Sequence, residues 1–123
     1  MAQIINLKTF TDKRGNLTVI EKILPFDIKR VFYIYGVDDS IRGHHRHKKT
    51  IQAVIALQGE CRIVNQGGAS LNTEEFILNS PSKCLILKPE DYHWMDKFSK
   101  DCILTVFASE YYDANDYIYD AYK

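Results

Sequence analysis

The chain of 123 residues contains 16 Lys and Arg, 16 Asp and Glu, and 46% hydrophobic residues. This length and composition predict one domain, residues 1–123, with a single hydrophobic core. The balanced charge argues against a protein dedicated to nucleic acid, which usually carries a basic excess. The first residues, MAQIINLKTF, lack the apolar stretch of a signal peptide, and no apolar run is long enough to span a membrane, so we expect a cytoplasmic protein that has no membrane partner.

Short apolar segments recur along the chain and are separated by turn-forming residues. The segments expected to form strands are 3–10, 17–24, 29–37, 50–65 (two strands), 74–79, 83–89 and 102–109. TDKRGN (residues 11–16) and NQGG (residues 65–68) are typical of hairpin turns. Many short strands with turns between them predict an all-β sandwich or barrel.

Two further features bear on how the strands pack. The run from Ile51 to Leu57 is apolar at odd and even positions, so both faces of this strand are expected to be covered, one by the barrel interior and the other by a second sheet or subunit. The Tyr-rich tail, about residues 110–123, predicts a turn or two of helix, and its tyrosines are expected to pack over the barrel or at a dimer contact.

The three cysteines are odd in number, far apart in sequence, and each lies in an apolar stretch. They are Cys61, Cys84 and Cys102. This pattern predicts reduced thiols in the core of a cytosolic protein, and the spacing of a zinc site is absent.

Three of the four histidines lie in RGHHRHKK, residues 42–49. On a strand, alternate residues share a face, so His45 and His47 are expected to project together while His44 and Arg46 point away. Two neighbouring imidazoles can bind a metal or transfer protons. A solvated basic loop is the third interpretation, and the local pattern alone leaves all three open.

The wider spacing resembles the first cupin motif, with Gly43, His45-x-His47, Gln52 and Gly59. Pro89 and His93 resemble the second cupin motif, although the spacing is one residue short and the usual glycine is missing. The resemblance implies a jelly-roll β-barrel of two antiparallel sheets with its site in the mouth. Gln52 occupies the position of the motif's acidic ligand, and an amide binds a metal more weakly than a carboxylate does. Positive charge disfavours a cation site, and the basic residues nearby in sequence are Arg42, Arg46, Lys48 and Lys49. We therefore expect no bound metal and no cofactor.

Longer stretches resemble the nucleotide-sugar 3,4-ketoisomerases that act on dTDP-4-keto-6-deoxyglucose. They are RGNL, PFDIKRVFYI, RGHHRHKK, QAVIALQGECRI, LNSP and HWMDKFSKDCILTVFASEYYDANDYI, which together run nearly from end to end. The resemblance implies a metal-independent isomerase that moves the keto group of a dTDP-4-keto-6-deoxyhexose from C4 to C3. Such enzymes supply the 3-keto sugar for 3-amino-3,6-dideoxyhexoses of bacterial surface glycans. The resemblance further implies a homodimer that exchanges N-terminal strands.

The chemistry assigns expected roles to the residues that match this family. His45 and His47 are the expected catalytic pair, because an imidazole accepts or donates a proton near neutral pH. The residues expected to bind the substrate are Arg14, Arg30, Arg42, Tyr33, Gln52 and His93. The arginines suit the diphosphate and the enediolate, whereas Lys48 and Lys49 are interpreted as surface charges. His93 could equally be a half-buried residue that forms hydrogen bonds at the rim of the barrel. The combination of Arg14 and His93 resembles the branch of the family whose product has an axial C4 hydroxyl.

One departure from the family concerns a tyrosine pair that often follows KRV. This chain has Phe32 and Tyr33 there, so the first hydroxyl is missing and its role falls to Tyr33, a histidine or water. Three alternatives to the isomerase stay open, and Phe32 bears on the second of them. They are a nucleotide-sugar 3,5-epimerase with a histidine–aspartate dyad and a tyrosine, a cupin that binds a sugar nucleotide without turnover, and a metal-dependent oxygenase, against which Gln52 counts.

Overall fold

The computed structural model describes residues 2–68 and 72–123. The strands are β1 (Gln3–Asn6), β2 (Lys8–Asp12), β3 (Gly15–Val19), β4 (Arg30–Tyr35), β5 (Arg42–His47), β6 (Gln52–Gln58), β7 (Cys61–Gly67), β8 (Thr73–Leu78), β9 (Lys83–Leu87), β10 (Asp91–Asp96), β11 (Ile103–Ala108) and β12 (Tyr117–Ile118). A 3-10 turn, η2 (Ala114–Asp116), precedes β12. Within the described ranges, no helix is long and apolar enough to cross a membrane.

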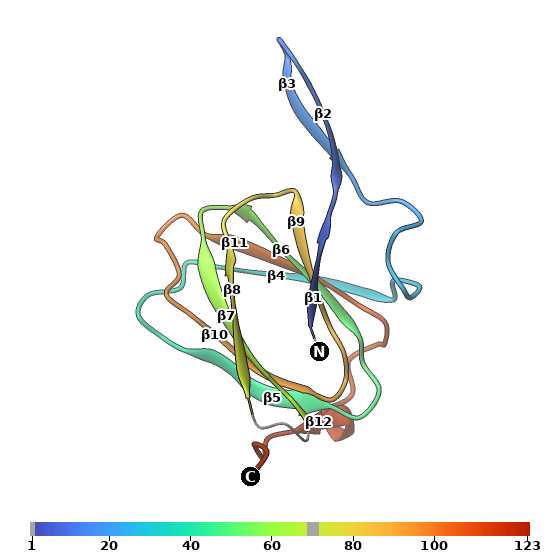
Figure 1. Ribbon diagram of the computed structural model, residues 1–123, viewed down its shortest axis with the longest axis vertical. Helices are drawn as coiled ribbons and strands as arrows, with labels where there is room; N and C mark the ends of the chain where they lie inside the picture. The colour runs from blue at the N-terminus through green and yellow to red at the C-terminus, as the bar shows by residue number, and fades with distance from the viewer. Residues whose placement is uncertain (1, 69–71) are drawn as a thin grey trace.

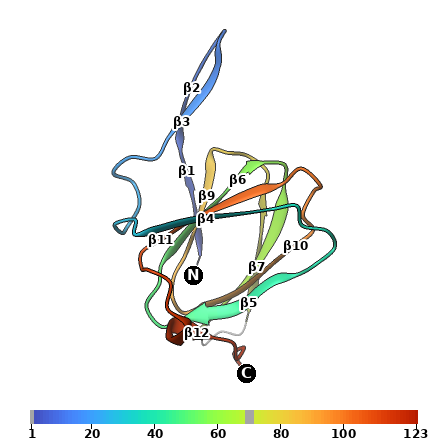
Figure 2. The same ribbon diagram turned by 180° about the vertical axis from the view of Figure 1, so that it is seen from behind.

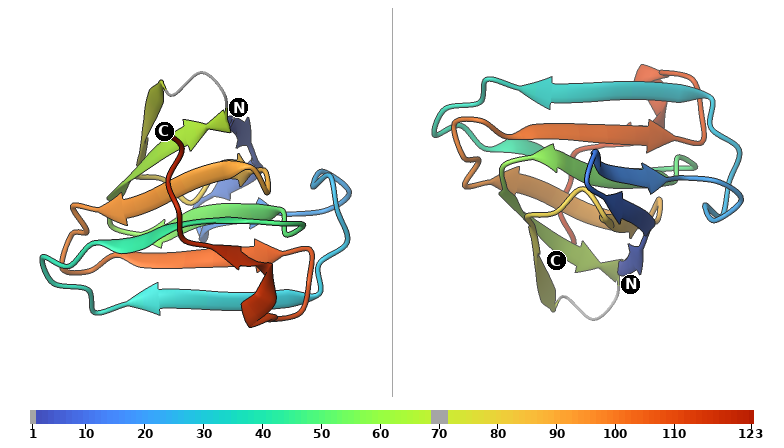
Figure 3. Two further views of the ribbon diagram at one scale, coloured as in Figure 1. Left: turned by 90° about the horizontal axis from the view of Figure 1, so that it is seen from below. Right: turned by 90° about the horizontal axis from the view of Figure 1, so that it is seen from above.

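The strands form two five-stranded antiparallel sheets and a separate two-stranded ribbon. One sheet has the order β1-β9-β6-β11-β4 and the other the order β12-β5-β10-β7-β8. Figure 3 shows the two sheets as the layers of one sandwich, which closes around the interior seen in Figure 1. The predicted all-β jelly roll is therefore confirmed.

The main core lies between the two sheets, and the alternation of each strand decides which residues enter it. On β4, Phe32 and Ile34 pack against the core, whereas Val31, Tyr33 and Tyr35 are exposed. The buried members from other strands include Val54, Leu85, Leu87, Leu104 and Val106. Period-two alternation thus gives β4 one apolar inner face and an outer face that meets solvent.

Strand β6 is buried on both faces, as its continuous apolar run predicts. Val54 joins the main core, and Ala53 and Ile55 join a second cluster on the opposite face of the sheet. This second cluster is covered by residues 20–26, which contribute Ile20, Leu24 and Phe26. The cover is therefore a loop of the same chain and not the second sheet or subunit that we expected, and Leu57 at the end of the run is 50% exposed.

The first predicted hairpin is confirmed, and the second is confirmed as a pair of strands, although Asn65 to Gly67 of its predicted turn lie in β7. β2 and β3 pair from Lys8↔Val19 to Asp12↔Gly15, and this ribbon projects from the sandwich at the end opposite the C-terminus (Figures 1 and 2). β1 pairs with β9 of the same chain. β7 and β8 also form an antiparallel pair, but Asn65 to Gly67 still belong to β7. Asn65 stays in the ladder because its buried amide bonds Glu74 and Asp91, and the connection continues through residues 69–71, outside the described residues.

The tail forms less helix than predicted. Its helical part is the single turn η2, capped by the Asp113 carboxylate, which accepts a hydrogen bond from the Asn115 N–H. The chain then extends into β12, which pairs with the histidine strand at Tyr117↔His47 and Ile118↔Arg46. The tail therefore lies along the strand that carries His45 and His47 and does not form a separate helix. The three cysteines are buried free thiols, as predicted.

Candidate active site

The site is built on strands β5 and β10, which pair through a β-bulge. His45 pairs with His93 and Gly43 pairs with Trp94, so His44 is the extra residue, with a φ of 59°. The His44 ring stacks on Trp94 on the outer face, with ring centroids 5.3 Å apart. Gly43 has a φ of 97°, and a Cβ there would lie 3.0 Å from the His93 carbonyl oxygen. Glycine is therefore required where the two strands approach most closely.

The bulge places His45 and His47 on one face, as the strand period predicts, and His93 lies opposite them. The ring centroids are 5.0 Å apart for His45 and His47, and 4.9 Å apart for His45 and His93. His93 is 1% exposed, and its Nδ1–H donates to the Asp91 carbonyl oxygen at 3.0 Å. Because a carbonyl only accepts, the Nε2 of His93 carries a lone pair, and this buried atom has no partner in the described structure.

Burial keeps the three imidazoles neutral near pH 7. Desolvation lowers the pKa of His45 to about 4, with the neighbouring His47 acting in the same direction. Desolvation and the nearby His45 lower the pKa of His93 to about 3. Burial also lowers the pKa of His47, and the hydrogen bond and the charge of Asp116 oppose this shift. The site therefore offers neutral nitrogen atoms that can accept protons.

Asp116, from the C-terminal turn η2, is joined to His47 by a buried hydrogen bond. Its Oδ2 lies 2.9 Å from the Nδ1 of His47 and also accepts a hydrogen bond from the Thr50 hydroxyl. Its Oδ1 accepts the Lys49 N–H at 2.8 Å. Burial acts to raise the pKa of Asp116, but these hydrogen bonds outweigh it and hold the pKa below the usual value. The carboxylate is thus ionised, and the Nε2 of His47 is left unpartnered.

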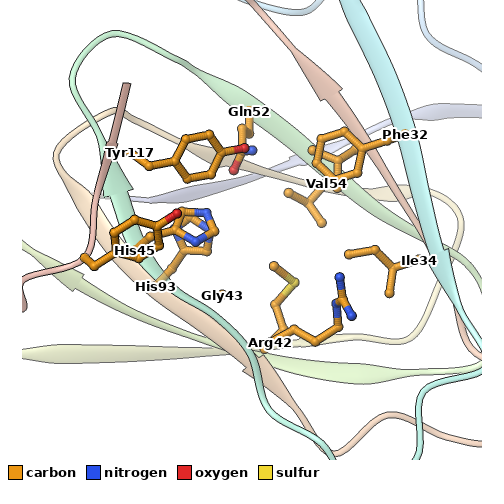
Figure 4. A pocket seen from close by; sticks show the side chains of 12 residues that line it. Phe32, Ile34, Arg42, Gly43, His45, Gln52, Val54, His93 and Tyr117 are labelled. Atoms are coloured by element: carbon orange, nitrogen blue, oxygen red, sulfur yellow. The ribbon is translucent and has the colours of Figure 1, made fainter. Parts of the chain in front are cut away.

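His45 and His93 open into a cavity of about 280 Å³ between the two sheets. Its polar lining comes from His45, His93, Gln52, Arg42 and Tyr117. Its apolar lining comes from Phe32, Ile34, Val54, Met95 and Val106. The exposed ring of Tyr119 also contributes to the lining. Figure 4 shows the Arg42 guanidinium directed into this space near Ile34, with the Tyr117 ring beside Gln52 on the opposite side. A mostly apolar wall with a few convergent polar groups is the usual form of a small-molecule site.

The structure therefore brings together most of the residues proposed from the sequence. His45, His93, Gln52 and Arg42 line the cavity, and the His47 ring lies edge-on to that of His45. Arg30 lies beside this group with its guanidinium 4.9 Å from the centre of the Phe32 ring, and its positive charge contributes to the lowered pKa of His47. The Nε of Arg30 is buried without a hydrogen-bond partner.

Two residues expected at the substrate lie elsewhere in this chain. Tyr33 is 64% exposed and stacks on Tyr35, because the alternation of β4 turns Phe32 and Ile34 inward. Arg14 lies at the tip of the projecting ribbon, where it forms an ion pair with Asp12 at 2.7 Å. Neither residue lines the cavity of its own chain.

Two residues of the tail were missed as site residues. The Tyr117 ring lies 4.9 Å from the ring of His45 and 4.7 Å from that of His47, and Asp116 binds His47. The stretch DYI, which contains both, contributed to the family resemblance, but no local spacing connects it to a histidine 69 residues away. Within residues 2–68 and 72–123, no group of three or more His, Cys, Asp and Glu is arranged to hold a metal ion.

Comparison with known proteins agrees with this geometry. A curated relative from Aneurinibacillus thermoaerophilus, TDP-4-oxo-6-deoxy-alpha-D-glucose-3,4-oxoisomerase, is 43% identical over 98% of this chain and 89% of its own length. A solved structure of the 3,4-ketoisomerase QdtA from Thermoanaerobacterium thermosaccharolyticum, a His-to-Asn mutant in complex with TDP-4-keto-6-deoxyglucose, is 43% identical, with a TM-score of 0.91 over 97% of this chain and 87% of that one.

A more distant likeness concerns the fold alone. The dTDP-6-deoxy-D-glucose-3,5-epimerase RmlC from Legionella pneumophila is 16% identical, with a TM-score of 0.81 over 94% of this chain and 70% of that one. The family model FdtA, described as WxcM-like, C-terminal, matches residues 1–123. Because the family model matches residues 1–123 and a relative is 43% identical over 98% of the chain, this chain belongs to the FdtA family.

Proposed function

We propose that this protein is a 3,4-ketoisomerase that moves the keto group of TDP-4-keto-6-deoxyglucose from C4 to C3. The observation that carries the proposal is the neutral His45–His47–His93 cluster at the cavity, in a chain 43% identical to a 3,4-oxoisomerase. The Aneurinibacillus relative is a TDP-4-oxo-6-deoxy-alpha-D-glucose-3,4-oxoisomerase, and the QdtA structure contains TDP-4-keto-6-deoxyglucose. The product would feed the biosynthesis of bacterial dideoxy amino sugars.

The reaction needs only proton transfers. The C4 ketone acidifies the C3 proton, and a base that removes it generates an enediolate across C3 and C4. A proton is then delivered to C4, O3 loses its proton and O4 gains one, so the carbonyl forms at C3, a hydroxyl forms at C4, and atoms and charge balance. An imidazole that stays neutral at pH 7 suits both the removal and the return of a proton.

Of the two paired histidines, His47 is the better base. Protonation of His47 creates an imidazolium beside the Asp116 carboxylate, which stabilises it. His45 has no carboxylate at hydrogen-bond distance among the described contacts, and its pKa of about 4 makes it a weak proton acceptor. We therefore assign the carbon-bound proton to His47, and to His45 the exchange of protons at the sugar oxygens.

The positive charges near the cavity fit the anionic parts of the substrate. Arg42 points into the cavity and can form paired hydrogen bonds with a diphosphate oxygen pair (Figure 4). Arg30 lies beside the histidines, and its unpartnered buried Nε suits a developing enediolate. Gln52, which is 4% exposed, adds a neutral amide that can hydrogen-bond a sugar hydroxyl without binding a cation.

Tyr117 supplies the hydroxyl that Phe32 lacks. Both side chains line the cavity, and Tyr117 contacts the His45 ring, whereas Tyr33 lies on the outer face. We assign the movement of the oxygen-bound protons to Tyr117 together with His45.

A time course of proton NMR spectra in D2O tests the proposed function. Chelator-treated protein is mixed with TDP-4-keto-6-deoxyglucose, and a 3-keto sugar with deuterium at C4 is the expected product. The coupling constants after reduction report the C4 configuration, for which we expect an axial hydroxyl. Unchanged substrate in the presence of protein shown to bind it would reject the isomerase in favour of a binding cupin.

The second candidate is a 3,5-epimerase, which the His47–Asp116 pair and the neighbouring Tyr117 specifically favour. An epimerase would place deuterium at C3 and C5 and leave the keto group at C4. The same spectra therefore distinguish the two reactions by which carbons exchange.

We further propose that the protein is a cytoplasmic homodimer with exchanged N-terminal segments, and the projecting ribbon supports the exchange. A two-stranded ribbon is marginal by itself, and Phe10 and Leu17 on this one are 54% and 60% exposed. A second copy of the chain would cover these side chains and would bring Arg14 to the partner's site. Sedimentation of the wild type as a dimer, and of the Phe10→Asp, Leu17→Asp variant as a monomer, would support the exchange. A wild type that sediments as a monomer would refute it.

A further inference from the structure

We infer that Asp116 is a positioning residue that holds His47 in the tautomer whose Nε2 can accept a proton. The inference rests on the proposed function, which it deepens by one residue, and on a buried contact between the tail and the histidine strand. Asp116 is 4% exposed and lies 69 residues from His47. Its position next to the strand depends on η2 and β12, which dock the tail against β5.

The hydrogen bonds of Asp116 leave its carboxylate one orientation. The Lys49 N–H can only donate, so it fixes Oδ1 at 2.8 Å. Oδ2 then faces the Thr50 hydroxyl and the Nδ1 of His47. An ionised carboxylate only accepts, so the hydrogen of the neutral imidazole must sit on Nδ1. The lone pair of His47 is thereby fixed on Nε2, which no described side chain occupies.

The charges around His47 give the same carboxylate a second effect. The groups that face His47 are His45 on its own strand, His93 on β10, Arg30 on β4, and Asp116 and Tyr117 of the tail. Burial lowers the pKa of His47 and the positive charge of Arg30 adds to this, whereas Asp116 opposes both. Removing the negative charge would therefore make His47 a weaker base.

The substitution Asp116→Asn changes the chemistry with little change in shape. The Lys49 N–H requires an acceptor, so the amide oxygen takes the place of Oδ1 and the NH2 group faces His47. An NH2 group donates, which moves the imidazole hydrogen to Nε2 and removes the lone pair from the active nitrogen. In a serine protease, the equivalent change lowers kcat about 10⁴-fold through the wrong tautomer. We expect a fall in kcat of about 10²- to 10⁴-fold with KM changed less than about threefold.

The matched control is Asp113→Asn, three residues earlier in the same tail. Asp113 is exposed and caps η2 through its side-chain oxygen, a role that asparagine also fills. It makes the same change of charge in the same segment without touching His47. We expect this variant to retain the kcat and KM of the wild type.

The deciding measurement is the tautomer of His47, read from two-bond ¹H–¹⁵N correlations in protein labelled with ¹⁵N-histidine. The chain has only four histidines, and the His47 signals are those lost in His47→Asn. We expect the Nδ1–H tautomer in the wild type and in Asp113→Asn, and the Nε2–H tautomer in Asp116→Asn. A purely structural role for Asp116 would change stability without inverting this pattern.

Each result bears on the inference independently of the proposed reaction. A wild-type His47 that carries its hydrogen on Nε2 would refute it even if Asp116→Asn failed to fold. An Asp116→Asn variant with an unchanged kcat on an active wild-type background would refute it and leave the isomerase intact. A wild type without isomerase activity would remove the proposed function, while the tautomers would still report whether Asp116 orients His47.

Discussion

Lowering the pH from 7 to 5 is expected to destabilise the folded protein through its buried histidines, of which His93 is the most deeply buried. This side chain is 1% exposed, and its pKa is about 3 in the folded state against 6.5 in a model peptide. Between these two values the unfolded chain binds a proton that the folded chain does not, so the stability present above pH 6.5 is lost as the pH falls. Each pH unit within this window costs about 1.4 kcal/mol, so His93 alone accounts for about 2 kcal/mol at pH 5.

The free energy of unfolding can be measured by urea denaturation at fixed protein concentration, followed by circular dichroism, at pH 7, 6 and 5. The variant His93→Gln removes the buried titrating group, and its loss of stability between pH 7 and 5 should be about 2 kcal/mol smaller than that of the wild type. His44→Gln is the matched control, because this neighbouring histidine is exposed on the outer face. His93 is intact in this variant, so the loss of stability assigned to His93 should remain.

The window from pH 7 to 5 lies above the range in which the lowered pKa values of Asp96 and Asp116 contribute. A wild type as stable at pH 5 as at pH 7 would contradict the argument, since it would mean that His93 is protonated equally in both states. Equal pH dependence in the wild type and His93→Gln would contradict the assignment to His93.

Three further predictions concern catalysis and the bulge. His45→Asn and His47→Asn should each lower kcat by about 10²- to 10⁴-fold, while the affinity for TDP, measured by calorimetry, stays within about threefold of the wild type. If both variants were fully active, the catalytic site would lie elsewhere. Tyr117→Phe should lower kcat by about 10²-fold and slow the exchange of the oxygen-bound protons, and normal turnover would assign that step to water. Gly43→Ala should lower the free energy of unfolding by about 1–3 kcal/mol, because a φ of 97° is strained for alanine and the new Cβ would lie 3.0 Å from the His93 carbonyl oxygen. An unchanged unfolding curve would refute the bulge geometry.

The strand pattern and the catalytic pair could be predicted because both depend on local rules. Apolar runs broken by turn residues identify the strands, and a period of two residues places His45 and His47 on one face. The continuous run from Ile51 predicted burial on both faces of β6, which holds as far as Ala56. What covers the second face could not be predicted, because a loop that packs back onto its own sheet has no periodic signal.

The faces of β4 and the reach of the ribbon depended on the tertiary structure. Phe32 and Tyr33 are adjacent, so alternation shows that they point in opposite directions but not which one enters the cavity. The pairing of β4 with β11 decides it, and Phe32 faces inward. The turn that carries Arg14 was recognisable, but whether its tip approaches the histidines depends on how the ribbon leaves the sandwich.

By itself, then, the sequence determined the all-β class, the histidine pair and the family, since each is a property of short stretches read in order. Only the tertiary structure decided that His93 completes the cluster as a buried neutral ring and that Asp116 and Tyr117 return to it from the tail. The physical reason is that these contacts join β10 and β12 to β5 across many residues of chain. Their pKa values likewise follow from burial and neighbouring charge, which exist only once the two sheets have packed.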